Sequence, residues 1–315
     1  MDNLVAATIV LADGSVKQLS TTSNPDLFWA IRGCGYNFGV VHEFVIKAFE
    51  QPNDVYAGML IFPEEKLEQV FEKAREWDAT KQQDEVVYVS FGRMSPDYHQ
   101  PIVGVMLWLN SPSSEEFQNR FKVFYSLEPI IDTTRAMSYP ESNSIYNEYI
   151  PYGDRKISVS AHFKHHVKIS SVKKAWKSFL DFTDPTNELG KKFVRCTSRY
   201  DFYNREGMRE YKNDETVCPT RDQKIYSVTI DARWTDDKVD KEAIKWLNQT
   251  RELFFDETTK DELSIINTST PAEEDMEKFC NPEKVYGKEN MEKLKELKRK
   301  YDPTCFFNKW VPIKI

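Results

Sequence analysis

A short segment near the N-terminus, RGCGYNFGVV at residues 32–41, combines three glycines with an asparagine and two aromatic residues. Glycine has no Cβ atom, so this backbone can lie against a flat, extended ligand and offer its N–H and C=O groups. Asn37 tolerates left-handed geometry and can hydrogen-bond back to the turn. The alternative is a tight helix-to-strand turn whose glycines only allow a positive φ angle. The residue types alone leave both interpretations open.

The order of the neighbouring elements excludes a Rossmann dinucleotide site. A Rossmann fingerprint follows a strand and opens a helix, so that the diphosphate meets the helix N-terminus. Here SNPDLFWAI, residues 23–31, predicts a helix with Pro25 in its first turn. The apolar, β-branched run VVHEFVIKAF, residues 40–49, predicts a largely buried strand. The glycines therefore follow a helix and open a strand, and their Gly-x-Gly-x-x-x-Gly spacing is one residue too long.

The composition is that of an ordinary globular protein, with 40% hydrophobic and 30% charged residues in a chain of 315. This length can hold two domains or one large one. A net charge of −7 argues against a nucleic-acid partner, and no apolar run approaches the ~20 residues that a membrane span needs. The five cysteines form no Cys-x-x-Cys pair, so neither a zinc site nor a disulfide framework is indicated.

The remaining elements that must position a site alternate between strands and amphipathic helices. Residues 185–223 have no clear periodicity and are expected to be irregular. The pattern predicts an α+β fold with a large antiparallel sheet and several helices on one face. Strands are expected at residues 4–11, 16–19, 55–62, 85–94, 101–110, 156–169 and 224–235, and helices at 64–77, 113–127, 172–182, 240–254, 273–279 and 289–302.

Three segments resemble the FAD-linked oxidases related to vanillyl-alcohol oxidase, in the berberine-bridge-enzyme and oligosaccharide-oxidase branch. NPDLFWAIRGCGYNFGVVHEFVIKAF, residues 24–49, is similar to the segment that closes the flavin domain of that family. VYGKENMEKLKELKRKYDPTCFF, residues 285–307, is similar to the C-terminal signature of this branch. PTRDQKIYSVTIDARWTD, residues 219–236, looks like the family strand that ends in tryptophan. The resemblance runs over essentially the whole chain.

The resemblance implies a flavin-binding domain built from both chain ends. Residues 1–53 would form the C-terminal piece of an FAD-binding domain, residues 54–272 an α+β substrate-binding domain, and residues 273–315 the segment that returns to the flavin side. The implied activity is hydride transfer from an alcohol, a sugar-like compound or a secondary metabolite to FAD, with O2 as acceptor. The rival hypothesis is a catalytically inactive small-molecule-binding or structural remnant of that family.

The resemblance also implies a set of flavin contacts in the glycine-rich segment. Cys34 and Tyr36 stand where the family has glycine, so this loop must accommodate bulkier side chains. The residues carried over as cofactor contacts are Gly33, Gly35, Asn37, Gly39, Val40 and Val41.

Three further residues are candidates for catalysis or substrate binding. Within IINTST, Asn267 matches a family position, but Ile265 and Thr268 replace the tyrosines that serve as the base, and a threonine is far too weak an acid–base group. Tyr286 matches the family's Tyr-Gly and would be either a surviving phenol in the pocket or a packed structural tyrosine. Arg221 would orient a polar substrate or pair with an aspartate.

Two expectations concern what the chain lacks. The glycine-rich phosphate cradle and the covalently bonded histidine of the family have no counterpart here, so we expect the N-terminal part of the FAD domain to be missing. An exposed apolar face should mark its place and allow self-association. No signal peptide is visible, although family members are often secreted, so the localisation stays unknown.

The cluster HFKHH, residues 162–166, could suggest a metal site. Two of its histidines share one face of a strand, but no carboxylate cluster stands beside them. A solvated strand face is the favoured interpretation, and no metal is expected.

Overall fold

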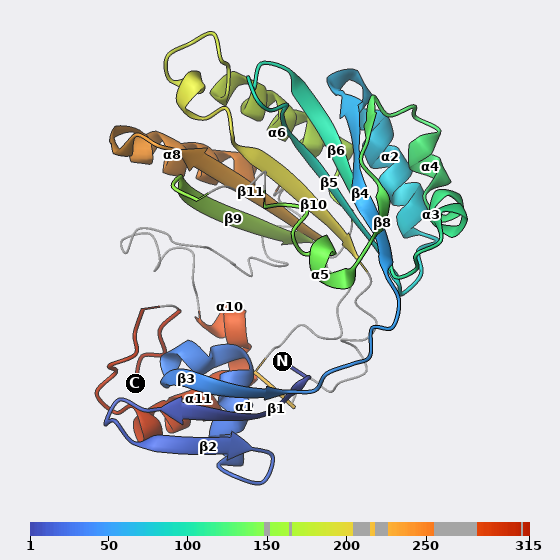
Figure 1. Cartoon of the computed structure of the whole chain (residues 1–315). Coiled ribbons are helices and arrows are strands. Elements are labelled where there is room, and N and C mark those ends of the chain that lie inside the picture. The colour runs from blue at the N-terminus through green and yellow to red at the C-terminus, as the bar shows by residue number, and fades with distance from the viewer. Residues whose placement is uncertain (148–151, 164–165, 204–214, 218–225, 255–281, 310) are drawn as a thin grey trace. The chain divides into compact units, whose positions relative to one another are not determined.

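The computed structural model forms two units (Figure 1). It describes residues 1–147, 152–163, 166–203, 215–217, 226–254, 282–309 and 311–315. Unit 1 comprises Met1–Glu50, Arg205–Gln223 and Ala272–Ile315. Unit 2 comprises Gln51–Asn204 and Lys224–Pro271. The two ends of the chain therefore belong to one unit, and the middle of the chain forms the other.

Unit 1 contains a three-stranded antiparallel sheet in the order β2-β1-β3. The Asp13-Gly14 turn joins the first two strands, with Gly14 at a φ of 79°. Trp29 and its neighbours Leu27, Phe28 and Ala30 are buried in the helix that follows. The elements of the N-terminal part are β1 (Leu4–Val10), β2 (Val16–Ser20), α1 (Pro25–Cys34) and β3 (Val40–Ile46).

The C-terminal helices α10 (Pro282–Tyr286) and α11 (Lys288–Tyr301) complete unit 1. Helix α11 contacts α1, and Lys300 and Tyr301 both bond the Asp26 carboxylate at the start of α1, at 2.7 and 3.0 Å. Near the middle of α11, the Lys293 ammonium lies 3.8 Å from the centre of the Trp29 ring. Residues more than 260 positions apart thus share one small core.

Unit 2 is built on an eight-stranded antiparallel sheet with the order β7-β4-β6-β5-β10-β11-β9, in which β8 also pairs with β4. Consecutive partners are in continuous register: Met59 faces Met106, and Tyr88 faces both Met106 and Asp201. The strands are β4 (Val55–Pro63), β5 (Glu85–Arg93), β6 (Pro101–Leu109), β7 (Ile131–Asp132), β8 (Arg135–Met137), β9 (Arg155–Phe163), β10 (Thr197–Tyr203) and β11 (Tyr226–Trp234).

Helices cover one face of this sheet and form the main core with it (Figure 1). The alternation of buried residues along each strand directs one set of apolar side chains against them. Phe91, for example, contacts Trp176 and Phe179 of one helix at ring distances of 5.1 and 5.3 Å. The helices of unit 2 are α2 (Leu67–Asp78), α3 (Ser114–Arg120), α4 (Lys122–Tyr125), α5 (Tyr139–Ser142), α6 (Ile169–Phe182) and α8 (Asp240–Glu252).

These findings confirm the α+β class and the large antiparallel sheet backed by helices. Two local expectations were wrong. Strand β10, at Thr197–Tyr203, lies inside the segment expected to be irregular, and it pairs with both β5 and β11. Strand β3 was expected to be largely buried, yet Phe44 is 58% and Ile46 is 63% exposed.

Candidate functional site

The glycine-rich segment forms a kinked helix end, a 3₁₀ turn at Gly35–Asn37 and the start of β3. Gly33 has a φ of 149°, a conformation that residues with a Cβ atom rarely adopt. A Cβ atom on Gly39 would lie against the Val10 carbonyl oxygen and 2.7 Å from Ile9 Cγ1, so glycine is required there by packing. At Gly35 the nearest atom would be Ile31 Cβ at 3.5 Å, an ordinary contact. Two of the three glycines therefore serve the turn itself.

Asn37 is fully buried and connects the two ends of the chain. Its side-chain oxygen accepts the Ile313 amide at 3.1 Å. Its side-chain nitrogen lies 3.4 Å from the Val311 carbonyl, 3.4 Å from the Tyr286 hydroxyl and 3.3 Å from Cys34 Sγ. All these partners are protein atoms, so the described geometry gives Asn37 a structural role.

Tyr286 lies beside Asn37 and is only 2% exposed. Its hydroxyl bonds the Tyr36 hydroxyl at 2.5 Å and lies 3.4 Å from the Val311 carbonyl. Burial, with the neighbouring Cys34 and Tyr36, raises the pKa of Tyr286 well above its ordinary value. A phenol held in this way is a poor proton acceptor near neutral pH. Its surroundings are those of the packed tyrosine considered above, and a catalytic role stays a prediction.

A buried lysine, Lys298, connects the glycine-rich turn to the C-terminal segment. The Lys298 ammonium donates to the Asn37 carbonyl, the Asp302 carboxylate and the Phe307 carbonyl, each at 2.7 Å. An ammonium has three hydrogens, and each of them has an acceptor here. Burial opposes the charge on Asp302, but Lys298 and the Phe307 and Phe306 amides outweigh it and lower the pKa of Asp302.

The predicted flavin contacts thus separate into two groups. Asn37 and Gly39 are occupied by internal contacts. Gly33 and Val40 are exposed, and Gly35 and Val41 are half-buried. The contact with FAD stays a prediction for all six. Asn267 and Arg221 lie outside the described residues.

A second candidate region, which the sequence analysis did not identify, lies on unit 2. The sheet face that is turned away from α2, α6 and α8 is apolar on β4 and β6, where Met59, Ile61 and Met106 cluster. On β5, β10 and β11 it is polar. We call this part the polar face; its residues are Tyr88, Ser90, Arg199, Asp201, Thr229 and Asp231, all half-buried.

The polar face contains an ordered set of charges. Arg199 Nε donates to Asp201 at 2.9 Å, and its guanidinium lies 5.2 Å from the centre of the Tyr88 ring. Burial opposes the charge on Arg199, but Asp201 outweighs it and raises the pKa of Arg199 above its ordinary value. Ser158 donates to Asp231 on the neighbouring strands. A sheet face with a cation, carboxylates and hydroxyl groups in fixed positions can bind a hydroxylated ligand by hydrogen bonds.

The sequence held one signal for this face that could have been used. TSRYDFY at β10 alternates polar and aromatic residues, which is typical of a half-buried strand. The clustering itself depends on the pairing of Arg199 with Ser90 and Thr229, on strands far away in the sequence. The sequence pattern of one strand does not reveal which residues of other strands lie opposite it.

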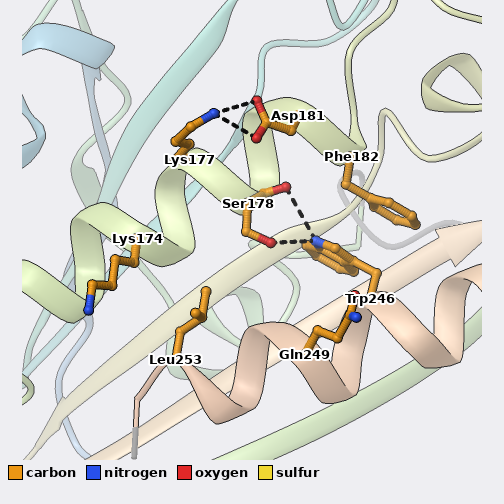
Figure 2. A pocket seen from close by; sticks show the side chains of 8 residues that line it. All are labelled: Lys174, Lys177, Ser178, Asp181, Phe182, Trp246, Gln249 and Leu253. Atoms are coloured by element: carbon orange, nitrogen blue, oxygen red, sulfur yellow. Dashed lines mark hydrogen bonds and ion pairs between the residues drawn. The ribbon is translucent and has the colours of Figure 1, made fainter.

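An open pocket of about 490 Å³ lies between α6 and α8, on the helical layer of unit 2 (Figure 2). Its polar groups bond one another: Trp246 Nε1 donates to Ser178 Oγ at 3.1 Å, and Lys177 pairs with Asp181 at 2.8 Å. The Phe182 ring stacks on Trp246 at 4.5 Å. These contacts describe the packing of two helices. The lining residues are Lys174, Lys177, Ser178, Asp181, Phe182, Trp246, Gln249 and Leu253.

The metal hypothesis receives no support from the described residues, among which no group of three or more potential ligands occurs. His166 instead lies 3.4 Å from the buried Asp78, and its ring centre lies 4.3 Å from that of Tyr226 in a tilted arrangement. His165 lies outside the described residues. Within the part of the chain that the structure describes, none of the helices combines the length and apolar character that a membrane crossing requires.

Comparison with known families and curated proteins identifies relatives over the whole chain. Residues 272–314 match the family described as "Berberine and berberine like". The FAD-linked oxidoreductase anuG of Penicillium roqueforti is 26% identical over 99% of this chain and 61% of its own length. The FAD-linked oxidoreductase pgmH of Aspergillus terreus is 28% identical over 99% of this chain and 65% of its own length. The chain therefore spans less than two thirds of these curated relatives.

Solved structures share the fold at lower identity. The 6-hydroxy-D-nicotine oxidase of Arthrobacter nicotinovorans has a TM-score of 0.75 at 20% identity and covers the whole of this chain and 66% of its own. The carbohydrate oxidase of Microdochium nivale has a TM-score of 0.72 at 21% identity and covers 100% of this chain and 67% of its own. The chain is thus similar over nearly its whole length to FAD-linked oxidoreductases, its residues 272–314 match the berberine-like family, and the solved structures share its fold.

Proposed function

We propose that this chain is the substrate-holding part of an FAD-dependent oxidoreductase. The substrate would be an alcohol, a sugar-like compound or a secondary metabolite, and O2 would be the final acceptor. FAD, when bound, supplies an acceptor for the hydride that leaves a C–H bond of the substrate. Gly33, Gly35, Val40 and Val41 are the described residues that would lie against the cofactor.

The observation that carries this proposal is the polar face. Most side chains that fill the sheet–helix core of unit 2 are apolar, whereas Arg199, Asp201 and Asp231 hold charges on the opposite face of the same strands. These charged side chains are half-buried, and Arg199 and Asp201 also pair with each other. The carboxylates can accept hydrogen bonds from substrate hydroxyl groups, and Arg199 can donate to a substrate oxygen. Together they would fix the orientation of the reacting carbon.

The alternative, a binding protein without catalysis, is favoured by one observation. Tyr286 matches a family tyrosine, but its hydroxyl is bonded to Tyr36 and its pKa is raised, so it is badly suited to act as a base. A chain without another base would hold the substrate and leave it unchanged. The two functions are distinguished by whether the substrate reduces the bound flavin.

The test begins with FAD. The purified chain is incubated with FAD and dialysed, and its visible absorbance is recorded before and after denaturation. Oligosaccharides, secondary alcohols and secondary amines are then added without oxygen, and bleaching of the flavin is followed. Flavin uptake with bleaching by one substrate class is the expected result. Ligand binding without bleaching would favour the alternative, and a chain that binds neither FAD nor any of these compounds would contradict both.

A matched pair of variants localises the binding. Asp201→Asn removes a carboxylate of the polar face, whereas Asp181→Asn removes one from the helical layer, where Asp181 pairs only with Lys177 in the described contacts. We expect the first substitution to weaken substrate affinity about tenfold, the usual effect of losing one charged hydrogen bond. The second should leave the affinity unchanged in the same calorimetric titration.

A further inference from the structure

In strand β3, Val40–Ile46, nearly all side chains are exposed to solvent. Among the strands that the structure describes, β3 pairs with β1 alone, so its other edge presents backbone groups that no described strand covers. Phe44, Val45 and Ile46 are 58%, 49% and 63% exposed. Because successive side chains point to opposite faces, this run is uncovered on both faces as well as at the edge.

The ladder continues beyond the end of the strand. The Lys47 amide donates to the Asn3 carbonyl at 2.7 Å, so the pairing with β1 extends to Lys47, although its register shifts at two points along β1. Phe49, two residues further on, is 65% exposed and lies 4.9 Å from the Lys47 ammonium. The exposed apolar surface therefore runs along the segment from Val40 to Phe49.

The sequence of this segment is complementary to itself. If two copies pair antiparallel with the two-fold axis at Val45, Glu43 of each copy faces Lys47 of the other, and Phe44 faces Ile46. Directly opposite residues have their Cβ atoms about 4.5–5.5 Å apart, where opposite charges attract and apolar pairs pack. Moving the axis by one residue, to Phe44 or to Ile46, places Lys47 opposite Val41 or opposite Val45, so the opposite charges no longer meet. One register is therefore clearly favoured.

The other edge of the same sheet provides a contrast. In β2, Val16–Ser20, Lys17 would face Leu19 if the axis lay at Gln18, and it would face itself if the axis lay at Lys17. That strand gives no pairing of opposite charges in a two-fold arrangement.

We propose that this chain self-associates into a two-fold symmetric dimer through antiparallel pairing of β3, with Val45 on the axis. The pairing would extend each three-stranded sheet into a continuous six-stranded one and cover the free edge of β3. Closed two-fold interfaces of this kind are the commonest among oligomers, and strand addition is a recurrent mode of association.

The test uses charge reversal in the full chain. Sedimentation equilibrium is measured over a concentration series for the natural chain, for Lys47→Glu and for Glu43→Lys/Lys47→Glu. Lys47→Glu places like charges face to face twice in the dimer, so we expect the dissociation constant to rise by about tenfold or more. The double variant restores opposite charges and should recover most of that loss. Lys17→Glu on β2 makes the same charge change and should have no effect.

A second measurement does not depend on charge. Val45→Cys places two thiols on the proposed axis, so the oxidised chain should migrate as a covalent dimer on a non-reducing gel, whereas Val16→Cys on β2 should not. A natural chain that stays monomeric at every concentration would overturn the proposal. So would a dimer that is indifferent to Lys47→Glu and gives no crosslink through residue 45, because another surface would then be responsible.

Discussion

At the scale of single residues, Asn37 stands at a position of the family motif, and its described partners are protein atoms. It bonds the Ile313 amide and lies within 3.4 Å of the Val311 carbonyl and the Tyr286 hydroxyl, all from the opposite end of the chain. A buried amide that satisfies several partners fixes a unique arrangement of the segments around it. Unit 1 therefore depends on Asn37 for the closure of its two halves.

We expect Asn37→Ala to lower the free energy of unfolding of unit 1 by about 2–3 kcal/mol, because the Ile313 amide would lose its acceptor in a buried site. Denaturant unfolding followed by tryptophan fluorescence would measure the change. Asn3→Ala, at an exposed position of the same unit, should change stability by less than about 0.5 kcal/mol. Equal effects of the two substitutions would show that the Asn37 contacts contribute little.

The Lys298–Asp302 pair predicts a pH dependence. The folded pKa of Asp302 lies below its ordinary value of about 4, so the unfolded chain binds more protons as the pH falls. The stability contributed by Asp302 is therefore fully present above about pH 4 and is lost as the pH falls through the lowered folded pKa. In Asp302→Asn this part of the acid dependence should disappear.

The same variant should be less stable by about 3–5 kcal/mol at neutral pH, because Lys298 would stay buried without its counter-charge. Urea unfolding between pH 3 and pH 7, followed by circular dichroism, separates the two effects. An unchanged acid dependence in Asp302→Asn would show that other carboxylates control it.

At the scale of elements, the segment from α1 to β3 contains one glycine that packing requires and one that it does not. We expect Gly39→Ala to destabilise unit 1 by about 1–3 kcal/mol, because its Cβ atom would meet the Val10 carbonyl and Ile9. Gly35→Ala meets only an ordinary contact with Ile31 and should be nearly neutral. Thermal unfolding of the two variants side by side provides the comparison. Equal destabilisation would mean that backbone freedom, rather than packing, governs the whole segment.

Elements with strong local patterns could be predicted from the sequence, and their pairings could not. The helix that starts at Pro25, the turn and the strand at Val40 were predicted because proline, glycine and β-branched residues act locally. Strand β10 was missed, and with it the polar face, because Ser198 pairs with Phe91 across more than a hundred residues. The apolar pattern of β3 correctly indicated a strand, but burial requires a covering partner, which sequence periodicity does not supply.

At the scale of the whole molecule, the two units differ in how their cores are assembled. The main core of unit 2 is a cluster that joins its sheet to α2, α6 and α8. The core of unit 1 needs both chain ends, because the buried Met291, Leu294 and Leu297 of α11 complement the buried face of α1. The two units should therefore respond differently to the loss of one chain end.

We expect a chain that ends at residue 271 to keep unit 2 folded and to lose unit 1. The truncation would remove α10, α11 and Ile313, and leave Asn37 without the partners at that end and Asp26 without Lys300 and Tyr301. Hydrogen exchange read by mass spectrometry should show unchanged protection for peptides from β5 and β6 and lost protection for peptides from β1 and α1. Protection retained in β1 and α1 would mean that the N-terminal sheet folds without the C-terminal helices, and the interdependence of the two ends, on which the flavin-side assignment depends, would then have to be abandoned.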